Sequence, residues 1–470
     1  MASTVSKQDE SFRSYALTAS PLRVILSTCA PLALFQALQS IFKILDALMA
    51  SHIGAEAVSA VAALSQVTLM ITAIGAGLAV GGSIKISEAY GRGDYEDVRT
   101  RVATVYALAV AVSILVAAVL IPFAVPFLRL LQTPEDLIEA GVGYFRIEIL
   151  TLVVNFFNTV YIAIARSRGH AKKILNLNLV VVVVKLALSA FFVYILHSGV
   201  VMIAVATLIG QVLMLIYALF SMSRDEGAFR FSLKNIRLNK STLMPIFHIS
   251  YPISAEKMLF AAGKVIVNSM SGMYGGLTVG ALGISNNIGG LTTSWHMGFT
   301  DGAAPLISQN RGAGKYKRTL QLYFTLLAVD VAIGVIGLGL VSWGLPWIAD
   351  VFARSEQMVD PAFREMIINI HKWEMLGYIT LGVNSATLAL LLGYGYTKLT
   401  MILNVARVFA FRVPVLWAFQ QFTNLGAEAV GMTMMISNVC VGLTAVVFAI
   451  PVVRKVSRLA REEEQTERMR

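Results

Sequence analysis

Charged side chains stand inside long apolar stretches of this 470-residue sequence. Asp46 lies in the stretch QSIFKILDALMASHIG, and Lys43 precedes it by three residues, on the same face of a helix. A charge at the centre of a bilayer costs at least about 2.5–3.5 kcal/mol, so an ionisable residue there is a functional candidate. Burial favours a neutral carboxyl group and a nearby cation favours the ionised form. Asp46 is therefore either a structural ion-pair partner of Lys43 or a carboxylate that alternates between a proton and an ammonium.

A lysine interrupts a later apolar run. Lys185 follows the sequence LVVVVV, so it cannot reach water unless its helix bends. It pairs either with Asp46 or with another acid. Two roles stay open for it: a structural charge pair, or a part of ion coupling and solute contact.

The second half of the chain has its own charged apolar stretch. Glu256 lies four residues after Pro252, and Lys264 follows on the same helical face, eight residues further on. A cationic solute would favour Glu256, whereas Lys257 and Lys264 also admit an anionic or zwitterionic solute. The alternative for Lys264 is an internal pair, or a side chain that reaches out to the membrane surface.

Several other residues of the second half have two interpretations. Arg407 and Arg412 flank the sequence FAF, and arginine suits fixed ion pairs, here with Glu374 or Asp301, or carboxylate recognition. Trp295 either lines a cavity or packs in the core. Glu374 lies near the start of an apolar stretch, where we expect it to reach the membrane surface. Asp330 has no obvious local partner.

The motifs of common enzymes do not occur. The sequence contains no HExxH, no credible GxSxG elbow, no DxxxD pair and no GxxxxGK[ST], and its six histidines are dispersed. Cys29 and Cys440 are too few and too far apart for a metal cluster or a disulfide framework. The sequence therefore predicts neither an enzyme nor a metal site nor a cofactor.

The elements that must position these residues are membrane helices. Hydrophobic residues make up 57% of the chain and charged residues 14%, with a mean hydropathy of +0.71, which excludes an ordinary soluble enzyme and a disordered protein. A membrane helix needs about 20 mostly apolar residues, and the stretches lack the alternation of a membrane barrel. We predict twelve spans, near residues 22–50, 56–88, 102–128, 138–165, 172–196, 200–222, 241–272, 277–309, 319–350, 365–393, 398–420 and 426–453.

The basic residues orient these spans. Most of the 38 Lys and Arg residues fall in segments on one side, and the opposite loops hold only Arg129, Arg354 and Arg364. By the positive-inside rule both termini and the loop 224–240 are cytoplasmic. The net charge of +11 is thus a topology signal, and we expect no nucleic-acid partner. The first apolar run is long enough to remain as a span, so no cleaved signal peptide is expected.

The two halves of the chain repeat each other. ILDALMASHIG (44–54) and VIVNSMSGMYGG (265–276) correspond, which aligns Asp46 with Asn268. Gly91-Arg92-Gly93 aligns with Gly312-Ala313-Gly314 in nearly the same register. Six spans in each half give both halves the same orientation. We predict an all-α polytopic membrane protein with twelve transmembrane helices in two six-helix lobes, 1–222 and 241–470, joined by a cytoplasmic linker, 223–240, and related by a pseudo-two-fold axis along the membrane normal.

This pattern resembles the multidrug and toxic compound extrusion (MATE) family of cation-coupled antiporters. The resemblance covers nearly the whole chain. It rests on Pro31, Asp46, Gly54, GRGD (91–94), RSRGHAKK (166–173), YP (251–252), Glu256, GAGK (312–315), Arg407 and FRVP (411–414). The details are closer to the prokaryotic branch named after the DNA-damage-inducible protein F (the DinF-like branch) than to the Na⁺-coupled branch typified by NorM. That second branch carries an Asp in span ten, where this chain has Asn384.

The resemblance implies alternating access and the exchange of an organic solute for H⁺ or Na⁺. In the DinF-like branch the coupling site combines the Asp of span one with groups in spans five and six, which places Asp46, Lys185, Ser189 and Thr207 in it. Lys185 and Ser189 depart from the Asn and Asp of the family, and an ammonium disfavours a hard cation, so we expect proton coupling. The expected solute cavity holds Lys43, Glu256, Lys264, Asn268, Trp295 and Arg407.

Other functions are weaker predictions. A flippase-like exporter of a polar lipid or an anionic solute fits the intramembrane bases. A transporter of the major facilitator type, a channel or receptor and an intramembrane enzyme fit less well. The expected partners are a small organic solute, H⁺ or Na⁺ and the lipid bilayer of a bacterial inner membrane, and the expected state is a monomer.

Overall fold

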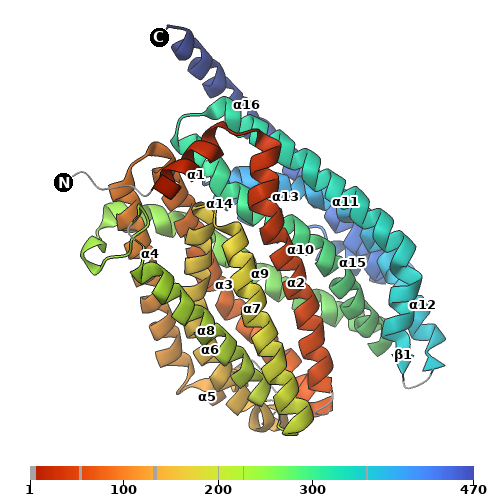
Figure 1. The fold of residues 1–470 in the computed structure, drawn as a ribbon. Helices are drawn as coiled ribbons and strands as arrows, with labels where there is room; N and C mark the ends of the chain where they lie inside the picture. The colour runs from red at the N-terminus through yellow and green to blue at the C-terminus, as the bar shows by residue number, and fades with distance from the viewer. Residues whose placement is uncertain are drawn as a thin grey trace. The chain divides into compact units, whose positions relative to one another are not determined.

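The computed structural model describes residues 7–51, 55–130, 135–199, 201–225, 227–355 and 358–469. Almost all of this backbone is helical, because a backbone in lipid must satisfy its polar groups within its own segment. The helices, most of which Figure 1 labels, are α1 (Lys7–Thr18), α2 (Pro21–Ser51), α3 (Ala55–Arg92), α4 (Tyr95–Leu120), α5 (Ala124–Leu130), α6 (Glu135–Ser167), α7 (Ala171–Ala190), α8 (Val201–Ser223), α9 (Lys240–Ser271), α10 (Gly276–Gly312), α11 (Tyr316–Ala353), α12 (Pro361–Glu374), α13 (Tyr378–Gly393), α14 (Thr397–Phe409), α15 (Val413–Phe422) and α16 (Glu428–Met469).

These helices confirm the all-α polytopic fold. Ten stretches of the described residues are long and apolar enough to cross a membrane. The seventh and eighth predicted spans coincide with α9 and α10, which fall outside those ten. Helix α9 carries Glu256, Lys257 and Lys264, and α10 is rich in Gly, Ser, Thr and Asn, which lowers the mean hydropathy of both helices.

Some predicted spans are broken rather than continuous. The eleventh stops at Phe409, ending α14, and restarts at Val413 as α15, where Pro414 cannot donate the backbone hydrogen bond of a continuous helix. The tenth is interrupted by a 3₁₀ turn, Met375–Gly377, between α12 and α13. Helix α7 passes into a π turn, Phe191–Ile195. The one strand pair in the described residues is a short antiparallel hairpin, β1 (Arg354–Ser355) and β2 (Met358–Val359).

The chain divides into two compact units. Unit 1 comprises residues 1–19, 41–258 and 308–313, and unit 2 comprises 20–40, 259–307 and 314–470. Helices α2, α9 and α10 therefore contribute to both units. The lobe boundaries at 222 and 241 stay a prediction from the repeat.

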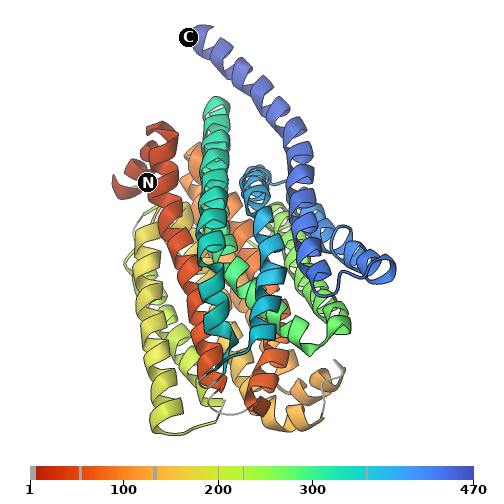
Figure 2. The same cartoon turned by 90° about the vertical axis from the view of Figure 1, so that its right-hand side faces the viewer.

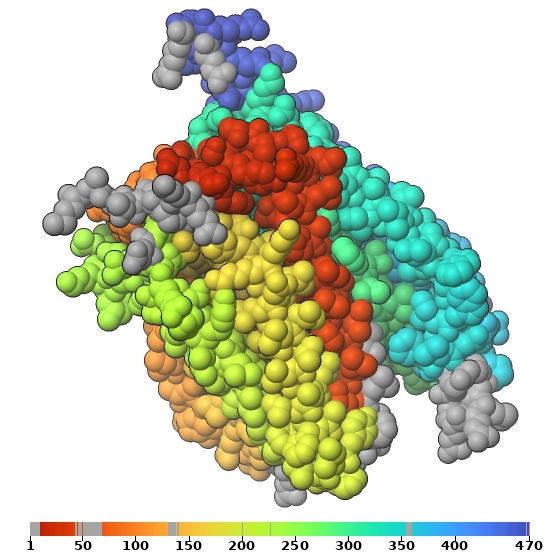
Figure 3. Space-filling view, viewed as in Figure 1, coloured from red at the N-terminus to blue at the C-terminus, as the bar shows by residue number. Residues whose placement is uncertain are grey.

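Unit 1 has its core between α3, α4, α6 and α8. Buried apolar side chains of these helices pack around the fully buried Tyr90. Helices α7 and α8 pack against each other, and Figure 3 shows them in yellow and yellow-green on one face of the unit.

Unit 2 is built around α11, α13 and α16. These three helices are mutual neighbours, and α12 and α14 also pack against α16. Figure 2 shows the C-terminal turns of α16, in blue, extending beyond the other helices of this unit.

The first helix is tied to segments far along the chain. The guanidinium of Arg13 donates to the carbonyl oxygens of Tyr90 and Gly91 at the end of α3, at 2.9–3.2 Å. The Asn310 side chain donates to the carbonyl oxygen of Ala16 at 3.3 Å, across 294 residues of sequence. Helix α1 is thus fixed to the ends of α3 and α10 within unit 1.

Candidate functional site

Lys185 lies where α7 meets α8. The two helices are in contact there, since a Cβ at Gly210 of α8 would lie 3.5 Å from Cβ of the half-buried Lys185. One turn further along α7, Ser189 is fully buried and its hydroxyl has no hydrogen-bond partner among the described residues. On α8, the Thr207 hydroxyl donates to the carbonyl oxygen of Ile203 at 3.1 Å. The structure thus places these three predicted coupling residues on two contacting helices.

The fourth predicted coupling residue, Asp46, belongs to α2, as does the predicted cavity residue Lys43. The backbone of Lys43 and Asp46 is helical, and their side chains lie outside the part of the chain that the structure describes. The pairing of Asp46 with Lys43 or Lys185 therefore stays a prediction.

In unit 2, two of the predicted cavity residues meet at Phe260. The ammonium of Lys264 lies 5.4 Å from the centre of the Phe260 ring, and the guanidinium of Arg407 lies 5.6 Å from it. Gly263 makes this possible, because Val408 of α14 fills the space that a side chain would take. The two cationic side chains therefore contact one aromatic ring.

The partner of Arg407 is an amide. Arg407 donates two hydrogen bonds to Oδ1 of Asn438, at 2.7 and 3.1 Å, and the buried Arg412 donates to Ser437 at 3.1 Å. The expected ion pairs of these arginines with Glu374 or Asp301 do not form in the described structure. The arginines instead fix α14, and the break after it, to α16.

Three further cavity residues lie on α9 and α10. Glu256 is half-buried on α9, in unit 1, and Asn268 is exposed near the end of the same helix. Trp295 is half-buried on α10. No hydrogen bond, ion pair or ring contact joins these three to one another in the part of the chain that the structure describes.

A buried chain of polar groups in unit 2 was missed by the sequence reasoning. Glu374 was expected to reach the membrane surface, but it is buried and accepts a hydrogen bond from the Ser285 hydroxyl. The Ser285 oxygen lies 2.8 Å from Nδ1 of His371, and Nε2 of His371 lies 2.9 Å from the Tyr378 hydroxyl. Serine, histidine and tyrosine can each donate or accept a hydrogen bond, so two directions of this chain are chemically allowed. The sequence signal was the His-x-x-Glu spacing in α12.

A second buried pair lies deeper in unit 2. Asp330 of α11 is fully buried, and its Oδ1 lies 3.0 Å from Nδ1 of His296 on α10. Oδ2 of Asp330 and Nε2 of His296 have no hydrogen-bond partner among the described residues. The partner that the sequence did not reveal for Asp330 is thus a histidine 34 residues away. In the described part of the chain no three His, Cys, Asp or Glu side chains gather to hold a metal ion.

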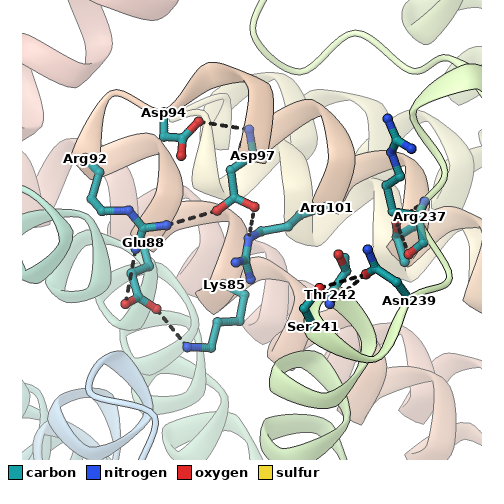
Figure 4. A network of polar contacts seen from close by, with 11 residues as sticks. Lys85, Glu88, Arg92, Asp94, Asp97, Arg101, Arg237, Asn239, Ser241 and Thr242 are labelled. Carbon is teal, nitrogen blue, oxygen red and sulfur yellow. Dashed lines mark hydrogen bonds and ion pairs between the residues drawn. The ribbon is translucent and has the colours of Figure 1, made fainter.

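The GRGD motif has a structural role in unit 1. Gly93 adopts a φ of +78°, and the Asp94 carboxylate accepts a hydrogen bond from the amide of Asp97 at 3.0 Å, which caps α4. Around this turn the ion pairs run from Lys85 to Glu88, to Arg92, to Asp97 and to Arg101 (Figure 4). These charges hold the turn between α3 and α4.

The aligned glycines of the repeat make reciprocal contacts in unit 1. A Cβ at Gly91 would lie 2.0 Å from the carbonyl oxygen of Gln309, and a Cβ at Gly312 would lie 2.2 Å from that of Glu88. Glu88 and Gln309 are themselves aligned in the repeat. Only glycine lets the ends of α3 and α10 approach so closely.

Long apolar helices with buried titratable groups define a polytopic membrane protein. Residues 31–191 and 252–418 match the MatE family. The chain belongs to the MatE family, the multidrug and toxic compound extrusion transporters. It is therefore a membrane transporter and not an enzyme, and its placement in the DinF-like branch stays a prediction.

The relatives agree with this assignment. The chain is 21% identical over 403 residues to the probable multidrug resistance protein YoeA of Bacillus subtilis, covering 84% of this chain and 86% of that protein. It is 24% identical over 413 residues to the probable multidrug resistance protein YpnP of the same organism, covering 87% and 91%. An outward-facing MATE transporter of the MOP superfamily superimposes with a TM-score of 0.90 at 19% identity, over 97% of this chain and 100% of that one. A Pyrococcus furiosus MOP transporter, described as having a binding pocket of reverse polarity, gives 0.89 at 19% identity over 97% and 99%.

Proposed function

We propose that this protein exports an organic solute across the bacterial inner membrane by alternating access, in exchange for H⁺. The family match over residues 31–191 and 252–418 carries the proposal. Relatives that align over most of their length are described as multidrug resistance proteins, which supports export. The distribution of basic residues supports cytoplasmic termini. The two lobes of a single chain suffice for this mechanism, so we propose a monomer.

Proton coupling is assigned to Asp46, with Lys185, Ser189 and Thr207 around it. An acid in the interior of a membrane is stable in its neutral form, and its deprotonation needs a compensating partner. Lys185 is the basic residue of the predicted coupling site, so we assign it the role of that partner. Protonation of Asp46 would release Lys185. It would thereby shift the population between the outward-facing and inward-facing states of the transporter.

The first test uses the full-length protein in proteoliposomes with an imposed pH gradient and a panel of cationic and anionic dyes. We expect Asp46→Asn to abolish dye-driven proton movement, because the side chain can no longer exchange a proton. Glu428→Gln is the matched control, since Glu428 pairs with Lys372 at a helix end and has no coupling role. Full coupled exchange by Asp46→Asn would remove Asp46 from the mechanism.

A second test separates H⁺ from Na⁺. Lys185→Asn removes the ammonium and supplies an amide oxygen, which a Na⁺ ion can use as a ligand. If the lysine excludes a metal ion, this variant gains Na⁺-dependent transport while the parent protein responds to the pH gradient alone. Unchanged ion dependence would show that Lys185 is a structural residue.

A second candidate function is export of an anionic solute or a polar lipid. The patch that Lys264 and Arg407 form on Phe260 favours it, because an anionic group gains two cationic neighbours there. In the dye panel this alternative predicts that the protein transports anionic dyes. It also predicts that Lys264→Gln loses this transport.

A further inference from the structure

Unit 1 contains a cavity whose lining includes Arg168, His170 and Lys173 of the RSRGHAKK motif (166–173). Its volume is about 410 Å³, and it lies between the end of α6, the start of α7, the end of α8 and the residues Arg224, Asp225, Gly227 and Phe229. By the proposed orientation these helix ends are at the cytoplasmic surface of the membrane. Three cationic side chains line it: Arg168, Lys173 and Arg224.

One of these cations is neutralised within the wall. Arg168 forms a two-pronged ion pair with Asp225, whose Oδ1 also accepts the amide of Gly227 at 3.0 Å. The guanidinium of Arg168 lies 5.1 Å from the ring of Phe229. This pair holds the segment after α8 in place and shapes the cavity.

The other two cations contact neutral groups. Lys173 donates to the neutral hydroxyl of Ser221 at 3.2 Å and lies 5.4 Å from the Tyr217 ring, and Arg224 lies 4.1 Å from the Phe220 ring. Within the described ranges neither has a carboxylate oxygen within 4 Å. Lys173 also stands in the first turn of α7, where the positive end of the helix dipole adds to the field. The cavity therefore offers two cations to an anionic ligand.

The surroundings favour a ligand with an apolar part. Tyr106, Tyr161 and Tyr217 give the cavity an aromatic lining with polar ends. On α8 an apolar strip leads away from it, with Ile216 58% exposed and Phe220 52% exposed. Such a strip in the bilayer contacts acyl chains. A headgroup in the cavity would continue into chains along α8.

We propose that this cavity binds the phosphate-bearing headgroup of an anionic phospholipid from the cytoplasmic leaflet, with Lys173 and Arg224 as its phosphate ligands. Basic pockets between helix ends on this side of a membrane suit such headgroups. The assignment to the cytoplasmic leaflet rests on the proposed orientation of the helices. Binding itself does not depend on transport, so failure of the export proposal leaves the site intact.

The test measures lipid binding to the purified full-length protein in detergent by native mass spectrometry. The probe is dioctanoyl phosphatidylglycerol, and dioctanoyl phosphatidylcholine supplies the same chains with a zwitterionic headgroup. We expect phosphatidylglycerol to bind more tightly, and each of Lys173→Gln and Arg224→Gln to weaken it by about fivefold. The matched controls Lys172→Gln and Arg230→Gln remove exposed cations that do not line the cavity and should leave its Kd unchanged.

Any of four outcomes would overturn the proposal. Equal Kd values for the two lipids would show that the site does not distinguish the charge of the headgroup. An unchanged Kd in both pocket variants, or an equal loss in the controls, would place the lipid elsewhere. Competition by inorganic phosphate at the same concentration as the lipid would show a site for a free anion. The Tm of each variant without lipid checks folding, and Lys173→Arg, which retains the charge, should restore binding.

Discussion

The two units of the molecule place their charged groups differently. In unit 1 the ion pairs described lie in turns at helix ends, as in the network from Lys85 to Arg101, and the interior polar contacts join uncharged groups such as Ser83 and Ser167. In unit 2 carboxyl groups and histidines lie in the interior, as His296 with Asp330 and His371 near Glu374. Charges at helix ends fix local structure at little cost. Interior pairs are held away from water, so their protonation is tied to the packing around them.

The largest effect is expected in the interior of unit 2. His296→Ala would leave Asp330 buried without its partner and destabilise the protein by about 3–5 kcal/mol. Chemical unfolding of the purified protein, followed by circular dichroism, measures this. The double variant His296→Leu, Asp330→Leu should recover most of the loss, because it removes both polar groups. A small loss in His296→Ala would show that Asp330 is neutral or finds another partner.

The second-largest effect on stability is expected at the close contact of α3 with α10 in unit 1. Gly312→Ala forces a methyl group against the Glu88 carbonyl oxygen, and such overpacking costs about 1–3 kcal/mol. Gly339→Ala, in open space on α11, is the control and should stabilise by about 0.5–1 kcal/mol through helix propensity. The Tm of the two variants should move in opposite directions. Equal shifts in Tm would mean that the backbone at Glu88 can move aside to admit the added methyl group.

The cap of α4 comes third. Asp94→Ala removes the side chain that accepts the Asp97 amide and should destabilise by about 1 kcal/mol. Asp94→Asn retains an acceptor oxygen and should restore most of this, as measured by the same unfolding assay. If both variants lose the same amount of stability, the charge of Asp94 contributes more than its hydrogen bond to the Asp97 amide.

The smallest effect is expected in the exposed ion pairs of unit 1. Arg92, whose side chain is 40% exposed, pairs with Asp97, and Arg92→Gln should change stability by about 0–1 kcal/mol and less at high salt. A loss as large as that of His296→Ala would erase the contrast between the units.

The sequence predicted the helices, but little of the interior of unit 2. Helices occur at all twelve predicted stretches, ten of which are long and apolar enough to cross a membrane, and the structure adds that the aligned glycines 91 and 312 make reciprocal contacts. The position of Glu374 along its helix indicated the membrane surface, yet burial depends on which neighbouring helix covers it, and that is a property of the tertiary packing. The same holds for Asp330, whose partner His296 is on another helix. Pro414 did signal the break between α14 and α15, which an expectation of continuous spans overlooked.

The tie between α1 and Asn310 has a consequence for biosynthesis. Helix α1 leaves the ribosome well before its partner, since 294 residues separate Ala16 from Asn310. At about 5–20 residues per second the wait lasts about 15–60 s. During that interval α1 can form its Arg13 hydrogen bonds to the end of α3 but not its contact with α10, so the attachment to Asn310 marks a late step in assembly.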